Sequence, residues 1–184
     1  MPLTHALKRQ TDYGTDTGFV MRFFEEYYQL LLFHLNRVNA EFSTPESAAD
    51  HIPGDADSAK AEALQLILNE LYETLQRQAM IAAQKGGEFA VSYYKEAQYA
   101  MAALTDELFL NLPGFTGKQY WSENLIESRL YGTHDSGERL FDYIAQFLRD
   151  RDATRKDIAE IYLLVLGVGF KGKFRGMPDQ RQLD

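Results

Sequence analysis

The sequence predicts an all-α protein in which six to eight helices pack as a bundle. Apolar residues recur at steps of three and four along several long segments, and clusters of glycine and proline separate these segments. No segment shows the convincing alternation of apolar and polar residues that indicates a strand. The 184 residues are 45% hydrophobic and 25% charged, which is enough for a sizeable core in one domain, or in one domain with two lobes.

The N-terminal part is predicted to contain a loose segment, a long helix and a linker. Residues 1–15 are polar and are expected to be flexible. A helical pattern then extends over residues 19–42, where aromatic and aliphatic side chains form one stripe. Residues 43–57 contain two prolines, a glycine and several aspartates, so they are predicted to form a linker.

Two further long helices are predicted in the middle of the chain. The first begins near Ser58 and ends at Gly86 and Gly87, because paired glycines are a common helix stop. The second covers residues 90–111 and is followed by Pro113. Its second half is apolar nearly all round, which predicts a central helix covered on most sides by others.

Three shorter helices are predicted in the last third. One covers residues 118–131. The next begins near Ser136, with the side chain of Asp135 or Ser136 as its N-terminal cap. The last begins at Thr154, which with Asp157 resembles a capping box.

Charge and composition exclude several classes of protein. The net charge is −8 and the pI is about 5.0, which argues against a nucleic-acid partner. The absence of cysteine excludes disulfides, thiolate-bound zinc and a cysteine nucleophile. The N-terminus contains no apolar signal sequence, and the longest clean apolar run, residues 161–170, is too short to span a bilayer.

Several motifs resemble active sites but fit structural roles better. Residues 167–172 match a dinucleotide-binding glycine pattern, but too little chain follows for the strand and helix that such a site needs. They are therefore predicted to form a helix end and a close-packed turn. The four histidines lack metal-ligand spacing, and His34 on an apolar stripe is predicted to be a hydrogen-bonded core residue. No cofactor and no metal is predicted.

Asp106 and Glu107 are the acidic residues of most interest, because they lie in the apolar central helix. A buried charge is costly unless it is paired. One interpretation is a salt bridge to Arg129, to Arg139 or to a basic residue near Lys173. The other is an acidic cleft that faces a partner protein.

Trp121 also allows two interpretations. It lies near the start of a predicted helix, with Leu125 one turn later. A core anchor is favoured, because a large aromatic side chain contributes most when it is buried. An exposed hot spot for binding a partner is the alternative.

Blocks in the second half of the chain resemble those of the DotU/TssL family. An alanine-rich helix closes in Asp106-Glu107 and is followed by Leu-Asn, and five further blocks follow in the family's order. These cover close to half of the chain, whereas the N-terminal half matches only in helical pattern. Polar Thr105 is a departure, because an apolar residue is expected there. The blocks are residues 99–111, 121–122, 131–133, 137–141, 162–163 and 169–174.

The resemblance implies a scaffold of the bacterial type VI secretion system rather than an enzyme. Family members are inner-membrane components whose cytoplasmic domain is a hook made of two small helical bundles. They associate with IcmF/TssM and with cytoplasmic baseplate proteins, TssK and also TssE. The full-length form is a candidate homodimer. We expect the domain to occupy residues 16–177 and to bind partners through Asp106, Glu107 and His134.

The resemblance also implies a single transmembrane helix near the C-terminus, which we expect beyond Asp184. Residues 178–184 would then form a juxtamembrane tail. Lys171, Lys173 and Arg175 lie just before this tail, where the positive-inside rule predicts basic residues on the cytoplasmic side. An ordinary solvated tail is the alternative.

Two other functions remain open from the sequence. The first is the homologous protein of type IVb secretion, which shares these blocks. The second is a small helical enzyme that uses Asp106, Glu107 and His134. An enzyme requires these three side chains to converge within hydrogen-bond reach, whereas a scaffold leaves them apart.

Overall fold

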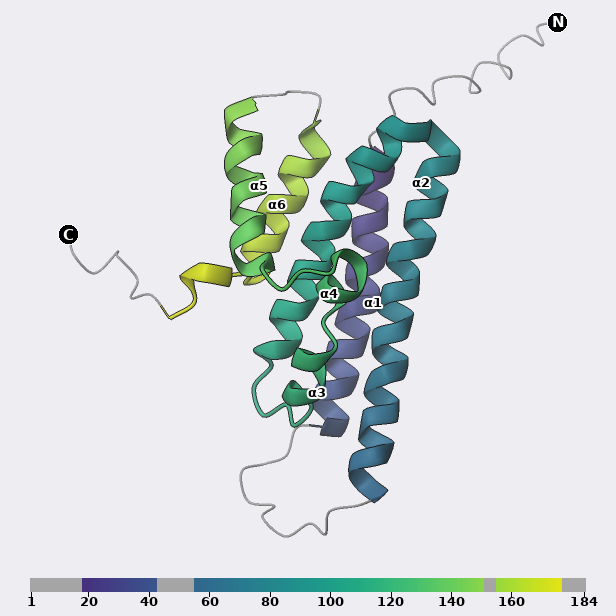
Figure 1. Cartoon of the computed structure of the whole chain (residues 1–184), viewed down its shortest axis with the longest axis vertical. Helices are drawn as coiled ribbons and strands as arrows, with labels where there is room; N and C mark the ends of the chain where they lie inside the picture. The colour runs from purple at the N-terminus through teal and green to yellow at the C-terminus, as the bar shows by residue number, and fades with distance from the viewer. Residues whose placement is uncertain (1–17, 43–54, 151–154, 177–184) are drawn as a thin grey trace, which may run out of the picture.

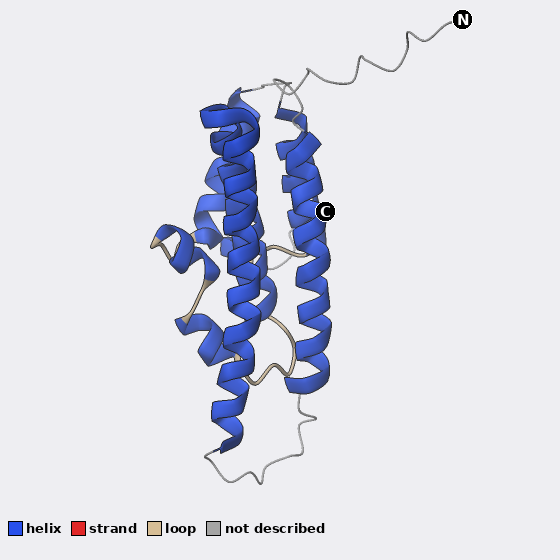
Figure 2. Cartoon of the chain, turned by 90° about the vertical axis from the view of Figure 1, so that its right-hand side faces the viewer, coloured by secondary structure: helices blue, strands red, loops and turns tan. Residues whose placement is uncertain are grey.

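A computed structural model of the chain describes residues 18–42, 55–150 and 155–176. All regular secondary structure within these residues is helical, and no strand occurs among them (Figure 2). The predicted all-α fold is confirmed. The hook shape with two sub-bundles and the count of six to eight helices stay predictions. The segment 1–15, the tail 178–184 and most of the linker lie outside the described residues.

The core is built by α1 (Gly18–Phe42) and α2 (Asp55–Leu110), which lie along the long axis of the molecule (Figure 1). The predicted helix at residues 19–42 is confirmed by α1. Its stripe of apolar side chains faces two antiparallel arms of α2 because burial of that face is the main gain in free energy. The most deeply buried side chains of these helices include Tyr27, Leu31, Leu64, Leu68, Leu71, Leu75, Tyr94 and Met101.

The chain reverses direction within α2 at Gly86 and Gly87 (Figure 1). Gly87 has φ 60° and ψ −144°, a conformation that side-chain-bearing residues rarely adopt. The first arm (residues 55–85) and the second arm (residues 88–110) are then joined by hydrogen bonds to the Leu75 carbonyl, one of them from Tyr94 Oη at 3.2 Å. The predicted helix stop at the glycine pair is confirmed.

The second arm of α2 is the central helix that the sequence predicted, since residues 97–106 are all buried. Polar Thr105 has its hydrogen bonds satisfied inside this core. Its Oγ1 donates to the carbonyl of Met101 at 2.8 Å and lies 2.8 Å from the hydroxyl of Tyr27 in α1. The hydroxyl at this position therefore joins α1 to α2.

The single helix predicted over residues 118–131 is wrong. Two short helices occur instead, α3 (Lys118–Glu123) and α4 (Ile126–Tyr131). Between them Leu125 adopts an extended backbone with φ −55° and ψ 139°, which starts a new helix in a new direction. The new helix begins here because the buried carboxylate of Asp106 accepts the N–H groups of Ile126 and Glu127.

Two longer helices, α5 (Ser136–Asp150) and α6 (Lys156–Val168), complete the fold with the 3₁₀ turn η2 (Gly172–Phe174). The predicted start of a helix at Ser136 is confirmed, whereas Thr154 lies outside the described residues. No helix in the described part of the chain combines the length and the apolar character needed to cross a bilayer.

The glycine-rich stretch after α6 forms a helix end and a close-packed turn, as predicted. Gly169 ends α6 with φ 117°. Gly172 has φ 45°, and a Cβ atom at this position would lie 2.4 Å from the carbonyl oxygen of Gly137. The backbone of η2 therefore lies so close to that of α5 that there is no room for a side chain at position 172.

Candidate functional site

Asp106 is buried at the junction of α2, α3 and α4, with 2% of its surface exposed. Its Oδ1 accepts hydrogen bonds from Trp121 Nε1 and from the backbone N–H of Ile126, both at 3.0 Å. Its Oδ2 accepts one from the N–H of Glu127 at 2.9 Å. A carboxylate at this position caps the N-terminus of α4 and complements the helix dipole. This cap explains why a new helix begins at Ile126.

Glu127 performs the same task for the next helix, α5. It is 1% exposed, and its Oε1 accepts hydrogen bonds from Thr133 Oγ1 at 2.7 Å and from Tyr99 Oη at 3.1 Å. The backbone N–H groups of Asp135 and Ser136 also donate to this carboxylate, each at 3.1 Å. The sequence predicted a local cap from Asp135 or Ser136, but the acceptor for these two amides comes from α4.

Asp106 and Glu127 therefore act in series, and we call this pair the carboxylate relay. Burial raises the pKa of Asp106 to about 6, although the three N–H donors oppose the shift. Burial also works to raise the pKa of Glu127, but its several hydrogen-bond donors outweigh burial and hold the pKa below its usual value. Through the relay, α2 holds α4, and α4 holds α5.

The predicted salt bridge of Asp106 to an arginine is wrong. All three of its hydrogen-bond donors are neutral N–H groups. Arg129 instead donates to Asn69 at 2.9 Å, and Arg139 pairs with Asp135 at 3.0 Å. Fixed N–H dipoles thus replace the cation that the sequence led us to expect.

Glu107 does form a salt bridge with a basic residue near Lys173, as predicted. Its Oε1 accepts hydrogen bonds from the N–H of Lys171 at 3.0 Å and of Gly172 at 3.3 Å. The same oxygen pairs with the guanidinium of Arg175. We call this set of contacts the C-terminal latch, because it fixes residues 171–175 against the end of α2.

Replacing Glu107 with glutamine is expected to loosen the C-terminal latch while the bundle stays folded. The amide retains an oxygen acceptor but loses the charge that strengthens these bonds. Hydrogen exchange at Lys171 and Gly172 should become about tenfold faster, because a hydrogen bond to a charged acceptor contributes roughly 1 to 1.5 kcal/mol more than one to a neutral acceptor. Glu123→Gln, at an exposed position in α3, is the matched control. Unchanged exchange in Glu107→Gln would contradict the latch.

His134 lies apart from the two acidic residues of the central helix. It is exposed, and its Nε2 lies 3.4 Å from Ser128 Oγ. Asp106 and Glu107 are each bonded to other groups. Within the described chain these three side chains do not converge as a catalytic set would. Partner binding by these residues stays a prediction, although Asp106 has almost no surface of its own to offer.

Trp121 and His34 are both buried in the core. Trp121 is fully buried, and its ring stacks on Phe109 with centroids 3.7 Å apart, so the core anchor is confirmed and the exposed hot spot is wrong. His34 is buried in α1, with Nε2 3.1 Å from Glu70 Oε2, and burial lowers its pKa. The predicted burial of this histidine is confirmed, whereas neither ring nitrogen has a partner in hydrogen-bond geometry among the described residues.

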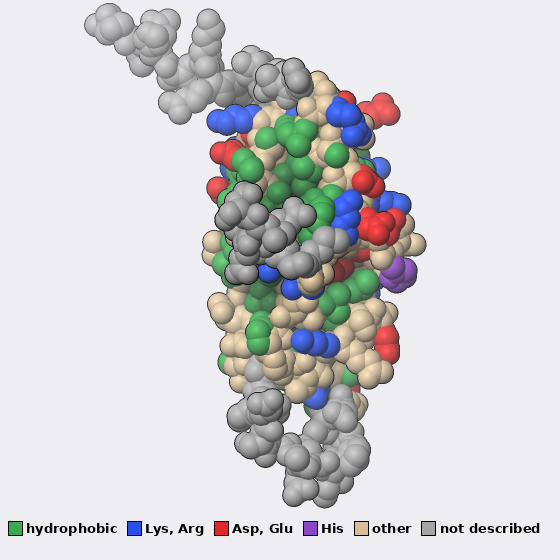
Figure 3. All heavy atoms as spheres, turned by 90° about the vertical axis from the view of Figure 1, so that its left-hand side faces the viewer, with side chains coloured by type: hydrophobic (Ala, Val, Ile, Leu, Met, Phe, Trp, Pro, Cys, Tyr) green, Lys and Arg blue, Asp and Glu red, His purple; other side chains and the backbone are tan. Residues whose placement is uncertain are grey.

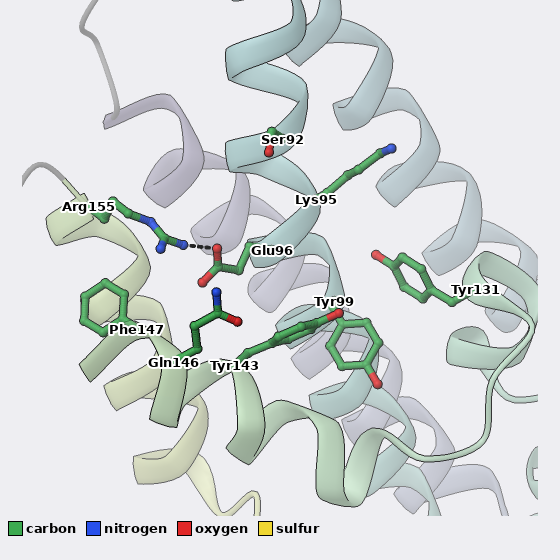
Figure 4. Close-up of a pocket in the computed structure, with 9 residues that line it drawn as sticks. All are labelled: Ser92, Lys95, Glu96, Tyr99, Tyr131, Tyr143, Gln146, Phe147 and Arg155. Atoms are coloured by element: carbon green, nitrogen blue, oxygen red, sulfur yellow. Dashed lines mark hydrogen bonds and ion pairs between the residues drawn. The ribbon is translucent and has the colours of Figure 1, made fainter. Parts of the chain in front are cut away.

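A cleft of about 300 Å³ opens between the second arm of α2 and α5 (Figure 4). Three tyrosine rings lie at one end of it. The centroid of Tyr99 is 5.0 Å from that of Tyr131 and 5.1 Å from that of Tyr143. This cleft was not predicted from the sequence, because its lining residues come from α2, α4, α5 and the position just before α6, and they share no local pattern.

The other end of the cleft contains an ion pair. Glu96 of α2 pairs with Arg155, which precedes α6 (Figure 4). The carboxylate of Glu96 also accepts a hydrogen bond from Tyr162. The guanidinium of Arg155 lies 5.4 Å from the centroid of the Phe147 ring of α5. The ion pair ties α2 to α6 and leaves α5 to close the cleft from the side.

The face that α5 and α6 present to solvent carries exposed apolar side chains with charged ones around them (Figure 3). Leu148 is 66% exposed, Leu163 70% and Phe174 49%. Phe174 packs on Phe141 with ring centroids 4.7 Å apart. A surface with several large exposed apolar groups is typical of a protein that contacts other molecules.

The pH dependence of stability is expected to reveal the charge state of Asp106. Its pKa is about 6 in the folded protein against an ordinary value of 3.8. Between these values the folded state keeps a proton that the unfolded state has released. The contribution of Asp106 to the free energy of unfolding therefore falls as pH rises from about 4 to about 6, by about 3 kcal/mol.

Urea denaturation of the wild type and of Asp106→Asn across this pH range tests the prediction. The variant lacks the titrating group, so the difference in free energy of unfolding isolates it. The wild type should lose stability relative to the variant as pH rises. Two parallel curves would show that Asp106 does not titrate in this range.

The fold and the site define a class of protein, an all-helical domain in which buried carboxylates position the domain's own helices. Comparison with known families then matches residues 47–184 to the family described as Type VI secretion system protein DotU. The match covers well over half of the chain, so the chain belongs to the DotU family. No curated protein and no solved structure matches it. The resemblance found in the sequence is confirmed.

Proposed function

We propose that this protein is a scaffold of the type VI secretion membrane complex. In this role it docks an IcmF/TssM-family protein and the baseplate proteins TssK and TssE at the bacterial inner membrane. The observation that carries the proposal is the family match over residues 47–184. The family is a structural component of the secretion machine, which favours binding over catalysis.

We infer that the domain faces the cytoplasm and is anchored by a transmembrane helix beyond Asp184, with a homodimer as a candidate for the full-length form. Lys171 and Lys173 are exposed near the end of the described chain, as cytoplasmic basic residues beside a membrane would be. Arg175 is also exposed but is engaged in the C-terminal latch. Anionic headgroups would be attracted to the two lysines.

We infer that the three candidate residues serve partner binding in different ways. His134 is exposed and is available for direct contact. Asp106 has only 2% of its surface exposed. The side chain of Glu107 is 12% exposed. They would act indirectly, because Asp106 positions α4 and Glu107 positions the segment that leads toward the membrane.

Capture of purified TssM-family and TssK proteins by the purified domain tests this function. The wild type should retain both partners. His134→Ala and Glu107→Lys should weaken retention while circular dichroism shows an unchanged helical content. Glu123→Lys, with the same charge reversal at an exposed position of α3, is the control. Failure of the wild type to bind either partner would overturn the scaffold role.

Neither alternative function gains support. The matching family is described as a type VI secretion protein, so the type IVb assignment is not favoured. A helical enzyme would require Asp106, Glu107 and His134 to converge, whereas each is bonded to a different part of the fold. Binding therefore remains the function that fits these side chains.

A further inference from the structure

The helix α5 packs on the bundle mainly through half-buried apolar side chains, Phe141, Tyr143, Ile144 and Phe147. Of its 15 residues only Leu140 is buried. The shorter helix α6 buries four side chains, Ile158, Ile161, Tyr162 and Val165. A helix with little buried apolar surface has a low free energy of local opening. Polar contacts at its N-terminus therefore add to this half-buried packing in holding α5 in place.

The polar contacts at the N-terminus of α5 come from Glu127. This carboxylate accepts the N–H groups of Asp135 and Ser136 and the hydroxyl of Thr133. Glu127 is the second residue of α4, so it reaches α5 only when α4 is formed and in place. The position of α4 depends in turn on the two N–H bonds to Asp106.

The same carboxylate is connected to the cleft. Glu127 Oε1 accepts a hydrogen bond from Tyr99 Oη, and the ring of Tyr99 packs on Tyr143 of α5. The side chains of Gln146 and Phe147, also from α5, line the same wall (Figure 4). Any outward movement of α5 would therefore widen the cleft and expose Tyr99.

We propose that α5 is a movable wall of the cleft and that Asp106 and Glu127, acting in series, hold it closed. The contacts follow one order, because Asp106 holds α4, and Glu127 of α4 holds α5. Loss of Glu127 releases α5 but leaves α4 capped by Asp106. Loss of Asp106 releases α4, and α5 opens with it. This inference goes beyond the scaffold role and is tested without any partner.

Hydrogen exchange measured by mass spectrometry tests the order of release. In Glu127→Gln, exchange in α5 should become about thirtyfold faster while α4 changes less than threefold, because charged hydrogen bonds at one helix end are lost. In Asp106→Asn both helices should exchange faster together. Glu138→Gln removes an exposed charge from the first turn of α5 and should change exchange less than threefold.

Two outcomes of this experiment would overturn the proposal. Unchanged α5 exchange in Glu127→Gln would show that the relay does not hold the helix. Equal acceleration in α4 and α5 for that variant would show that the two helices open as one unit without a direction. Glu127→Gln alone decides both points, so the proposal remains testable even if Asp106→Asn fails to fold.

A distance measurement tests the movement itself. The sequence contains no cysteine, so Ser92→Cys in α2 and Gln146→Cys in α5 would carry the only two spin labels. Both residues line the cleft and are exposed. The distance distribution by pulsed electron resonance should be narrow in this background and should broaden to longer distances when Glu127→Gln is added. An identical distribution in both proteins would exclude a movable wall.

Discussion

Replacing Asp106 with alanine is expected to lower the free energy of unfolding by about 4 kcal/mol. The change leaves the N–H groups of Trp121, Ile126 and Glu127 without an acceptor inside the protein. In a domain of this size the loss corresponds to a fall in melting temperature of roughly 10 °C. Thermal unfolding followed by circular dichroism measures it.

The control for this experiment is Glu123→Ala, an acidic residue removed from the surface of α3. Its effect should stay within about 0.5 kcal/mol, as is usual for exposed positions. If Asp106→Ala were equally mild, the carboxylate would not be the cap of α4. Charge reversal at Asp106 is also a poor probe of partner binding, because loss of capture could reflect unfolding.

Replacing Trp121 with alanine is expected to cost about 4 kcal/mol, because large aromatic side chains leave a cavity when they are truncated. The indole is fully buried and stacks on Phe109. It also supplies one of the three donors to Asp106. Urea denaturation followed by circular dichroism gives the loss of stability.

A second variant, Trp121→Phe, separates packing from hydrogen bonding. It keeps an aromatic ring against Phe109 but removes the N–H donor, so the expected loss is only about 1 to 2 kcal/mol. Similar losses in the alanine and phenylalanine variants would mean that the hydrogen bond, and not the packing, fixes this part of the core.

The elements that were predictable from the sequence depend on local signals. The reversal at Gly86 and Gly87 follows from backbone freedom that only glycine provides. The central helix follows from a segment that is apolar on every side. The end of α6 at Gly169 follows from the same glycine chemistry. Each signal lies within a few residues of the feature that it predicts.

The elements that were not predictable depend on contacts across the fold. The break at Leu125 is produced by Asp106, which lies 19 positions earlier in the chain. The cap of α5 comes from Glu127 rather than from the neighbouring Asp135. Helical periodicity shows which face is apolar, but it does not show which amide a buried carboxylate will meet. Glu127 gave no such signal, because it lies in the interior of the single helix that the sequence predicted over residues 118–131.

Asp106 and Glu107 are adjacent in α2, but their carboxylates bind different segments of the chain. Successive side chains point about 100° apart around the axis. Asp106 therefore faces α3 and α4, whereas Glu107 faces the C-terminal latch. From the sequence the two acids shared the same pair of interpretations, a salt bridge or an acidic cleft, whereas in the structure each carboxylate holds its own segment.

The reversal in α2 has a consequence for assembly. The hairpin and a single straight helix of roughly 84 Å differ only in the torsion angles of two residues. A bulkier residue in place of Gly87 would favour the straight form, in which the two arms of α2 could no longer pack side by side within one molecule. Two such chains would complete each other's cores by exchanging arms, so this glycine keeps the folded unit self-contained.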